Sequence, residues 1–232
     1  LNPDDLVRVR AFDWDVQFKD IMKNGGFDAV VGNPPWGQKA VTWTTEEKQY
    51  LRNSFRVGHG ILDLFKLFCE RSILLVKTNG CWGMILPDIV LLKNYPETRR
   101  FILETASISE IAFAGMAFEG ADIDTVCITA RRANIPPDSS HQISIIRALE
   151  PPPASNLASG DPLPQSLFWK LQDYKFNIHL DPARLKLMEK LQGKKKQDYL
   201  CEARKGTRLG NIRVKLLVAV FSLKKKKKMI FG

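Results

Sequence analysis

The chain has 232 residues, of which 44% are hydrophobic and 26% are charged, which excludes a disordered or fibrous protein and suits one sizeable α/β domain with a smaller appendage. Its net charge of +10 is compatible with nucleic-acid or anionic partners, although many basic residues, such as Lys224–Lys228, lie near the C-terminal end. The apolar stretch Leu216–Leu223 is too short to span a bilayer and the start lacks an apolar leader, so we expect a cytoplasmic protein.

The first predicted element is a strand over residues 27–32, Phe-Asp-Ala-Val-Val-Gly. This short apolar run lies between Gly25-Gly26 and an Asn-Pro-Pro sequence, which is typical of a strand buried on both faces. We therefore place it in the middle of a sheet. The next element, Glu46–Phe55, is predicted to be a helix with Thr44 or Thr45 as its N-cap.

The apolar face and length of Ile61–Lys77 predict a helix that packs on a sheet and is ended by Asn79-Gly80. Four further elements follow in order: a strand at Cys81–Leu86, a helix at Glu97–Thr105, and strands at Ile108–Phe113 and Thr125–Ala130. This alternation predicts an α/β fold with a doubly wound, largely parallel sheet. The last two strands, with no helix between them, suggest an antiparallel hairpin at one edge.

The C-terminal part changes in character. Residues 150–166 combine several prolines with Ser, Ala and Gly, so we expect a linker, placed at 150–180. Asp181–Leu191 predicts one more helix, with Asp181 as N-cap and a proline in its first turn. The Lys224–Lys228 run follows an apolar stretch without a period, and we interpret the last twenty or so residues as a truncated or out-of-frame tail.

The tetrapeptide Asn33-Pro34-Pro35-Trp36 directly follows the first strand, at the end where open α/β sheets bind ligands. The exocyclic amine of adenine is a poor nucleophile, because its lone pair is delocalised into the ring. Two acceptors, the Asn33 side-chain oxygen and a Pro34 carbonyl fixed by successive prolines, could take both amine hydrogens and expose that lone pair to a methyl donor. Trp36 could stack on a base flipped out of its duplex. The same residues could instead form a turn that only ends the strand.

The stretch Val30–Trp36 resembles the signature of amino-methyltransferases that act on adenine. Its surroundings resemble the long-chain type IIG branch of restriction-modification enzymes over residues 8–133, with a weaker similarity at 181–211. The matching segments are Phe12-Asp13-Trp14-Asp15, Gly25-Gly26-Phe27-Asp28, Asp63–Arg71 and Gly83–Pro87. The resemblance implies a site-specific DNA adenine-N6 methyltransferase of a restriction-modification system, dependent on S-adenosyl-L-methionine, that acts on a flipped adenine in double-stranded DNA.

The resemblance also implies a fold and a site. The fold is a partial Rossmann-like class I methyltransferase sheet, with residues 1–149 as the C-terminal half of the catalytic domain. Residues 150–180 would be the Pro-rich linker, and 181–232 the truncated start of a target-recognition domain with a basic tail. In the site, Asn33 and the Pro34 carbonyl would bind the target amine, Pro35 would shape the loop and Trp36 would stack on the adenine.

The Gly-rich turn with which the family binds its cofactor lies upstream of the tetrapeptide, and the sequence contains no such turn. We interpret Gly58-His59-Gly60 as a loop and find the spacing of Asp13 unconvincing for a cofactor ligand, so the cofactor-binding residues stay unassigned. Cysteines 69, 81, 127 and 201 have no metal-ligand spacing, and we interpret them as reduced thiols without a metal site.

The chain supplies strands on only one side of residues 27–32, so the other edge would expose unpaired backbone and apolar surface. We therefore expect this chain alone to be unstable, cofactor-free and inactive, and the missing N-terminal part of the same enzyme to be a partner. Two alternatives stay open. One is a non-catalytic DNA-binding remnant, and the other is a glutamine or RNA-guanine amino-methyltransferase that shares the Asn-Pro-Pro motif.

Overall fold

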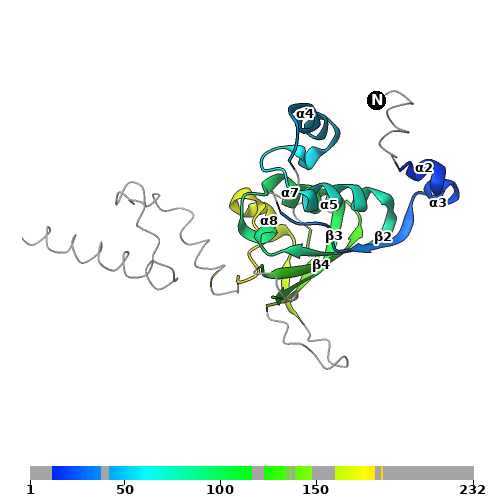
Figure 1. The fold of residues 1–232 in the computed structure, drawn as a ribbon. Coiled ribbons are helices and arrows are strands. Elements are labelled where there is room, and N and C mark those ends of the chain that lie inside the picture. Colours follow the sequence, from blue (N-terminus) through cyan, green and yellow to red (C-terminus); the bar gives the residue numbers. More distant parts are fainter. Residues whose placement is uncertain are drawn as a thin grey trace, which may run out of the picture. The chain divides into compact units, whose positions relative to one another are not determined.

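The computed structural model describes residues 12–37, 42–116, 123–134, 136, 139–147, 160–180 and 184. The chain divides into two units, of which the first is residues 1–179. Its strands form a six-stranded sheet in the order β1-β2-β4-β3-β5-β6 (Figure 1). They are β1 (Phe27–Gly32), β2 (Val76–Pro87), β3 (Ala106–Gly115), β4 (Thr125–Arg132), β5 (Gln142–Ile146) and β6 (Asp161–Pro164). The predicted α/β class is confirmed.

The sheet is mixed rather than largely parallel. Strands β1 and β2 are parallel, as are β3 and β5, whereas β2 with β4, β3 with β4, and β5 with β6 are antiparallel. The β3–β4 hairpin expected at an edge therefore lies inside the sheet, between β2 and β5. This follows because β5, which the sequence analysis did not predict, pairs with the outer side of β3.

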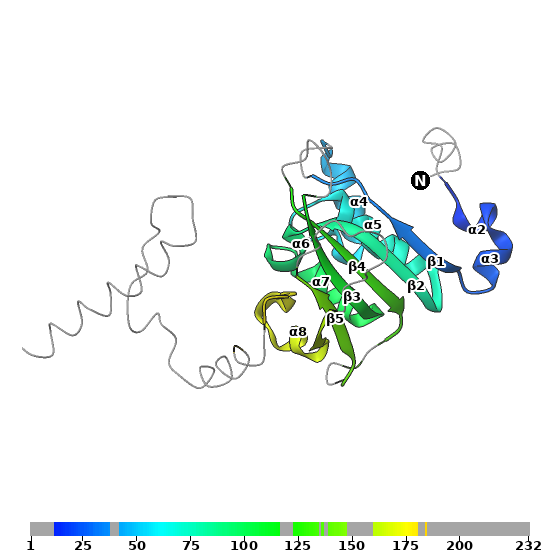
Figure 2. The same ribbon diagram turned by 90° about the horizontal axis from the view of Figure 1, so that it is seen from below.

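Helices cover one face of this sheet. The described helices are α2 (Trp14–Gln17), α3 (Lys19–Lys23), α4 (Thr45–Ser54), η1 (Arg56–Gly58), α5 (Leu64–Leu75), α6 (Ile89–Leu92), α7 (Pro96–Thr105), α8 (Ser166–Lys170) and η2 (Gln172–Tyr174). Of these, α2 and α3 lie beyond the β1 edge of the sheet (Figures 1 and 2). Both views place α5 and α7 on the same side of the strands, and the opposite side carries no helix from the described ranges (Figures 1 and 2). Strand residues that face the helices, such as Trp82, are buried, and the Trp82 indole N–H donates to Ser72 Oγ at 2.8 Å.

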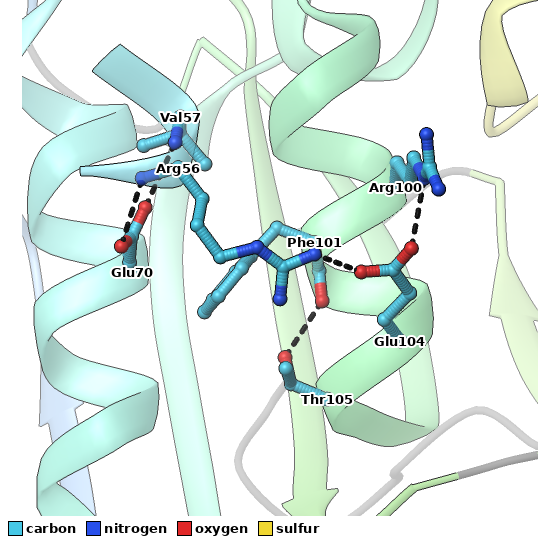
Figure 3. Close-up of polar contacts among 7 residues, drawn as sticks. All are labelled: Arg56, Val57, Glu70, Arg100, Phe101, Glu104 and Thr105. Atoms are coloured by element: carbon cyan, nitrogen blue, oxygen red, sulfur yellow. Dashed lines mark hydrogen bonds and ion pairs between the residues drawn. The ribbon is translucent and has the colours of Figure 1, made fainter. Parts of the chain in front are cut away.

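Figure 3 shows how polar contacts join the helical layer. The Glu70 carboxylate of α5 accepts from the backbone N–H groups of Arg56 (3.1 Å) and Val57 (2.9 Å), which satisfies two donors at the start of η1. The Arg56 guanidinium pairs with Glu104 of α7 and lies over the Phe101 ring, 5.2 Å from its centroid. These contacts hold α5, η1 and α7 together.

Several predicted elements are confirmed. Strand β1 has the predicted bounds, and α4 begins after Thr44, whose side chain accepts from the Glu47 N–H in a capping box. The predicted helices at Ile61–Lys77 and Glu97–Thr105 correspond to α5 and α7. Each of these elements has a local signal, either an apolar period or a cap, that is readable from the sequence alone.

The predicted helix end at Asn79-Gly80 is wrong. Helix α5 ends at Leu75, and Asn79-Gly80 lies within β2, where Asn79 has a φ of 65°. The glycine has a different role here: a Cβ at Gly80 would come within 2.8 Å of the Asp28 carbonyl oxygen of β1. Gly80 thus allows β1 and β2 to approach each other closely.

Strand β1 is not buried on both faces. It lies at the edge of the described sheet, and Val31 is 80% exposed. Within the described residues β1 pairs with β2 on one side, so its other side presents backbone N–H and C=O groups without a strand partner. An apolar strand in this position has the composition of a central strand and the environment of an edge.

Residues 160–180, expected to form part of a linker, are folded. Pro162 and Pro164 lie in β6, an edge strand, where a missing N–H costs no ladder hydrogen bond on the open side. Phe168 and Phe176 are fully buried with their rings stacked, 4.8 Å between centroids. The predicted helix at 181–191, apart from Arg184, and the Lys run lie outside the described residues.

Candidate active-site cleft

The tetrapeptide forms the loop that leaves the carboxyl end of β1. Asn33 is exposed, Pro34 is buried, Pro35 is exposed and Trp36 is half-buried. The strand ends here because two successive prolines cannot donate to a ladder. Just before the loop, a Cβ at Gly32 would come within 3.2 Å of the Met84 sulfur, so the glycine lets β1 pack tightly against β2 at the point where Asn33 emerges.

Asn33 and Pro34 line a cleft of about 290 Å³. Residues of β1, β2 and α5 line it, together with a tryptophan of α2. Its lining consists of Val30, Val31, Gly32 and Met84 from the strands, Phe68, Arg71, Ser72 and Leu75 from α5, with Trp14, Asn33 and Pro34. A largely apolar cleft with a few convergent polar groups is the usual form of a small-molecule site.

Trp14 reaches the cleft from an aromatic cluster of Phe12, Trp14, Phe18 and Phe27. The Trp14 ring is stacked on Phe18 at 5.8 Å and meets Phe27 edge-on at 5.9 Å. Asp13 caps the short helix α2, because its Oδ1 accepts from the N–H groups of Asp15 (3.0 Å) and Val16 (3.3 Å). The carboxylate of Asp13 is therefore engaged in holding α2.

A buried carboxylate lies at the far end of the loop. The Gly37 N–H donates to Asp63 Oδ1 at 3.1 Å, and the Tyr95 hydroxyl donates to Oδ2 at 3.4 Å. Asp63 is only 2% exposed, and this burial raises its pKa above the ordinary value, while the hydrogen bond from Gly37 acts in the opposite direction.

Lys66 lies one turn further along α5 and is also buried. Burial lowers its pKa to about 8, against the attraction of the Glu97 and Asp63 carboxylates. Its ammonium donates to the His59 carbonyl at 2.5 Å. Gly58 ends η1, and His59 after it supplies a backbone acceptor; none of Gly58, His59 and Gly60 lines the cleft.

Residues 2–117 match the family of Eco57I restriction-modification methylases. This chain belongs to that family. The resemblance to restriction-modification methyltransferases found in the sequence is confirmed at the level of the family. The match contains β1, the tetrapeptide, α5, β2 and β3, so the cleft lies within residues 2–117, the methylase segment.

Two relatives of the methylase segment are named as type II enzymes. Over 144 residues the chain is 26% identical to RM.MjaORFECS2P of Methanocaldococcus jannaschii, provisionally named a type II restriction enzyme and methyltransferase, covering 61% of this chain and 12% of that protein. Over 115 residues it is 27% identical to the type II restriction enzyme and methyltransferase RM.Eco57I of Escherichia coli, covering 48% of this chain and 11% of that protein. The chain spans only a small part of both.

Among solved structures, the type IIG restriction endonuclease BpuSI is similar with a TM-score of 0.43 and 18% identity, covering 53% of this chain and 15% of that chain. Within the described ranges, no helix of the methylase segment or of the residues after it is long and apolar enough to cross a membrane.

The cleft and the tetrapeptide loop are lined or held by residues that the sequence patterns did not single out. Trp14, Phe68 and Arg71 line the cleft, and Asp63 and Tyr95 hold the loop. The sequence carried only an indirect signal for the first four, which fall inside the segments that resemble the family. Tyr95 lies outside those segments.

Proposed function

We propose that this chain holds the target base in a site-specific DNA adenine-N6 methyltransferase of a restriction-modification system. The observation that carries the proposal is the exposed Asn33, set at the carboxyl end of β1 and lining a mostly apolar cleft beside the backbone of buried Pro34. Double-stranded DNA with a flipped adenine is the proposed substrate, because a base inside the stack could not enter such a cleft.

In the proposed reaction, Asn33 Oδ1 and the Pro34 carbonyl accept the two hydrogens of the adenine amine. The amine nitrogen then moves toward tetrahedral geometry, and its lone pair becomes available to attack a methyl group. As the new N–C bond forms, the bond from the methyl carbon to its leaving group breaks and its electron pair stays with that group, and the methylated nitrogen releases one proton to water. Trp36, which ends the tetrapeptide after Pro35, is proposed to stack on the flipped base.

S-adenosyl-L-methionine is the proposed methyl donor, and it would supply the methyl group on a positively charged sulfur. The described residues do not fit it as a complete site. Neither β1 nor β2 is followed by a Gly-rich turn, since β1 leads into Asn33-Pro34 and β2 ends at Pro87 before Asp88. We therefore assign no cofactor contact to the described residues and place the cofactor-binding turn in another part of the enzyme.

The outer edge of β1 supports this division. The strand has an apolar composition, an exposed Val31 and one described strand partner, and the sheet face away from α5 and α7 has no described helix. An upstream part of the same enzyme that paired with β1 would bury this edge. We expect residues 1–232 alone to give no S-adenosyl-L-methionine binding in calorimetry, whereas a chain extended upstream binds it. Micromolar binding by residues 1–232 would contradict this division.

The proposed reaction is tested by its product. The full-length enzyme is incubated with duplex DNA and methyl-labelled S-adenosyl-L-methionine, and the DNA is digested to nucleosides. We expect the label in N6-methyl-2′-deoxyadenosine, and only from duplexes that contain the recognition sequence of the enzyme. If protein or RNA offered in parallel took up the label at glutamine or at guanine, the substrate would be that group and not DNA adenine. Salt-dependent DNA binding without any methyl transfer would favour a non-catalytic role.

A further inference from the structure

The buried Asp63 carboxylate connects the tetrapeptide loop to the helical layer through hydrogen bonds. It lies 26 residues after Gly37 in the sequence and 32 before Tyr95, yet its two carboxylate oxygens accept from these two residues. Because the carboxylate is 2% exposed, little water competes for either oxygen. A carboxylate held at both oxygens in a buried site has one fixed orientation.

The loop from Asn33 to Gly37 is short and is anchored at both ends. At its start, Gly32 is paired with Met84 in the parallel ladder of β1 and β2. At its end, Gly37 has a φ of 107°, a conformation that favours glycine, and its N–H is directed at Asp63. Pro34 and Pro35 between them have restricted φ angles. Fixing the two ends therefore fixes the direction of the Asn33 side chain and of the Pro34 carbonyl.

Packed side chains surround the Asp63 carboxylate and hold it in place. Tyr95 is 2% exposed, and its ring meets the Phe65 ring edge-on with 5.0 Å between centroids. Lys66, buried in the next turn of α5, is held by the His59 carbonyl and attracts the Asp63 carboxylate. The Asp63 oxygens thus lie on a rigid part of the protein, while the loop that they hold lies at the cleft.

We infer that Asp63 is a positioning residue for methyl transfer, which sets the geometry of the two amine acceptors by holding the Gly37 N–H. The inference rests on the proposed function. Asp63 contacts neither the base nor the methyl donor in this scheme, and it acts through the loop. Its loss would displace the acceptors, and a displacement of about 1 Å costs on the order of 10²-fold in rate. The effect falls on kcat more than on KM, since the amine is gripped most strongly in the transition state.

The test compares Asp63→Ser with Asp63→Asn in the full-length enzyme. Serine keeps a side-chain oxygen suited to the N-cap position of α5 but is too short to reach Gly37. We expect its kcat to fall about 10- to 100-fold, with KM values for DNA and S-adenosyl-L-methionine within about threefold of the wild type. Asparagine keeps an acceptor of the right length for the Gly37 N–H, and we expect kcat within about fivefold of the wild type.

Glu70→Gln is the matched control. Glu70 is also a buried carboxylate of α5 that accepts two backbone N–H groups, but those belong to Arg56 and Val57 of η1 and not to the tetrapeptide loop. We expect this variant to lose stability without losing kcat per folded molecule. An equal loss of kcat in Glu70→Gln and Asp63→Ser would overturn the inference, as would an Asp63→Asn variant no better than the serine.

Two further variants keep the outcome decisive. If Asp63→Ser does not fold, Tyr95→Phe removes the hydroxyl that holds Oδ2 and keeps the ring against Phe65; a kcat about three- to fivefold lower is expected, and an unchanged kcat would refute the positioning role. Asn33→Ala is measured in the same series. Full activity of that variant removes the proposed function itself, whereas an inactive Asn33→Ala beside a fully active Asp63→Ser removes only the role of Asp63.

Discussion

Replacing Asn33 with alanine is expected to lower the kcat of the full-length enzyme by about 10²- to 10³-fold, which is the usual cost of removing one preorganised polar contact to a transition state. Asn33 is exposed at the end of β1, so its truncation leaves no cavity in the core and folding should be preserved. The loss should therefore appear in the chemical step. Single-turnover transfer of labelled methyl groups to duplex DNA measures it directly.

Two variants bracket this result. Asn33→Asp keeps an acceptor oxygen at the same distance from the backbone, so we expect more residual activity than in Asn33→Ala. Asn53→Ala changes an exposed asparagine on α4 that bonds Gln49, and we expect wild-type kcat from it. If Asn33→Ala retained kcat within about threefold, the tetrapeptide would be a turn that ends β1 and no more.

The elements that could be predicted from the sequence depend on local signals, and those that could not depend on contacts between distant residues. The bounds of β1 and the capping box of α4 are encoded within a few consecutive residues. Strand β6 was missed because prolines 162 and 164 suggest a linker, and only the pairing with β5 makes them an edge strand. Asn79-Gly80 has the composition of a helix end, but the close approach of β1 decides its conformation.

The candidate site divides in the same way. Asn33 to Trp36 are contiguous, and the chemistry of an amide beside two prolines can be recognised without a structure. Asp63 is brought to the loop from 26 residues away and Tyr95 joins it from another helix boundary. No spacing rule connects these residues, since their contact depends on how α5 and α7 pack on the sheet. Sequence reasoning thus found the groups proposed to touch the base but not those that hold them.

Arg99→Met is expected to destabilise the full-length enzyme by about 3–5 kcal/mol, the range for breaking a buried charged network. The Arg99 side chain is fully buried, and burial lowers the pKa of its guanidinium to about 10, although the Asp173 and Glu97 carboxylates act in the opposite direction. The guanidinium donates to the Val90 (2.8 Å) and Lys93 (3.0 Å) carbonyls, and through two of its nitrogens to the Asp173 carbonyl (3.1 and 2.8 Å). Methionine fills similar volume but leaves all three carbonyls without this donor.

The neighbouring Arg100 provides the control for Arg99→Met. Arg100 is exposed and pairs with Glu104 one turn along α7, so we expect Arg100→Met to cost less than about 1 kcal/mol. Urea unfolding curves of both variants measure the difference, and equal losses would refute the role of Arg99. The Arg99 side chain also donates to the Lys93 carbonyl, two residues before Tyr95, so it helps to fix the start of α7, where the Tyr95 hydroxyl reaches Asp63. A folded Arg99→Met enzyme should therefore also lose part of its kcat, because Tyr95 and Asp63, which hold the tetrapeptide loop, depend on the packing that this arginine holds.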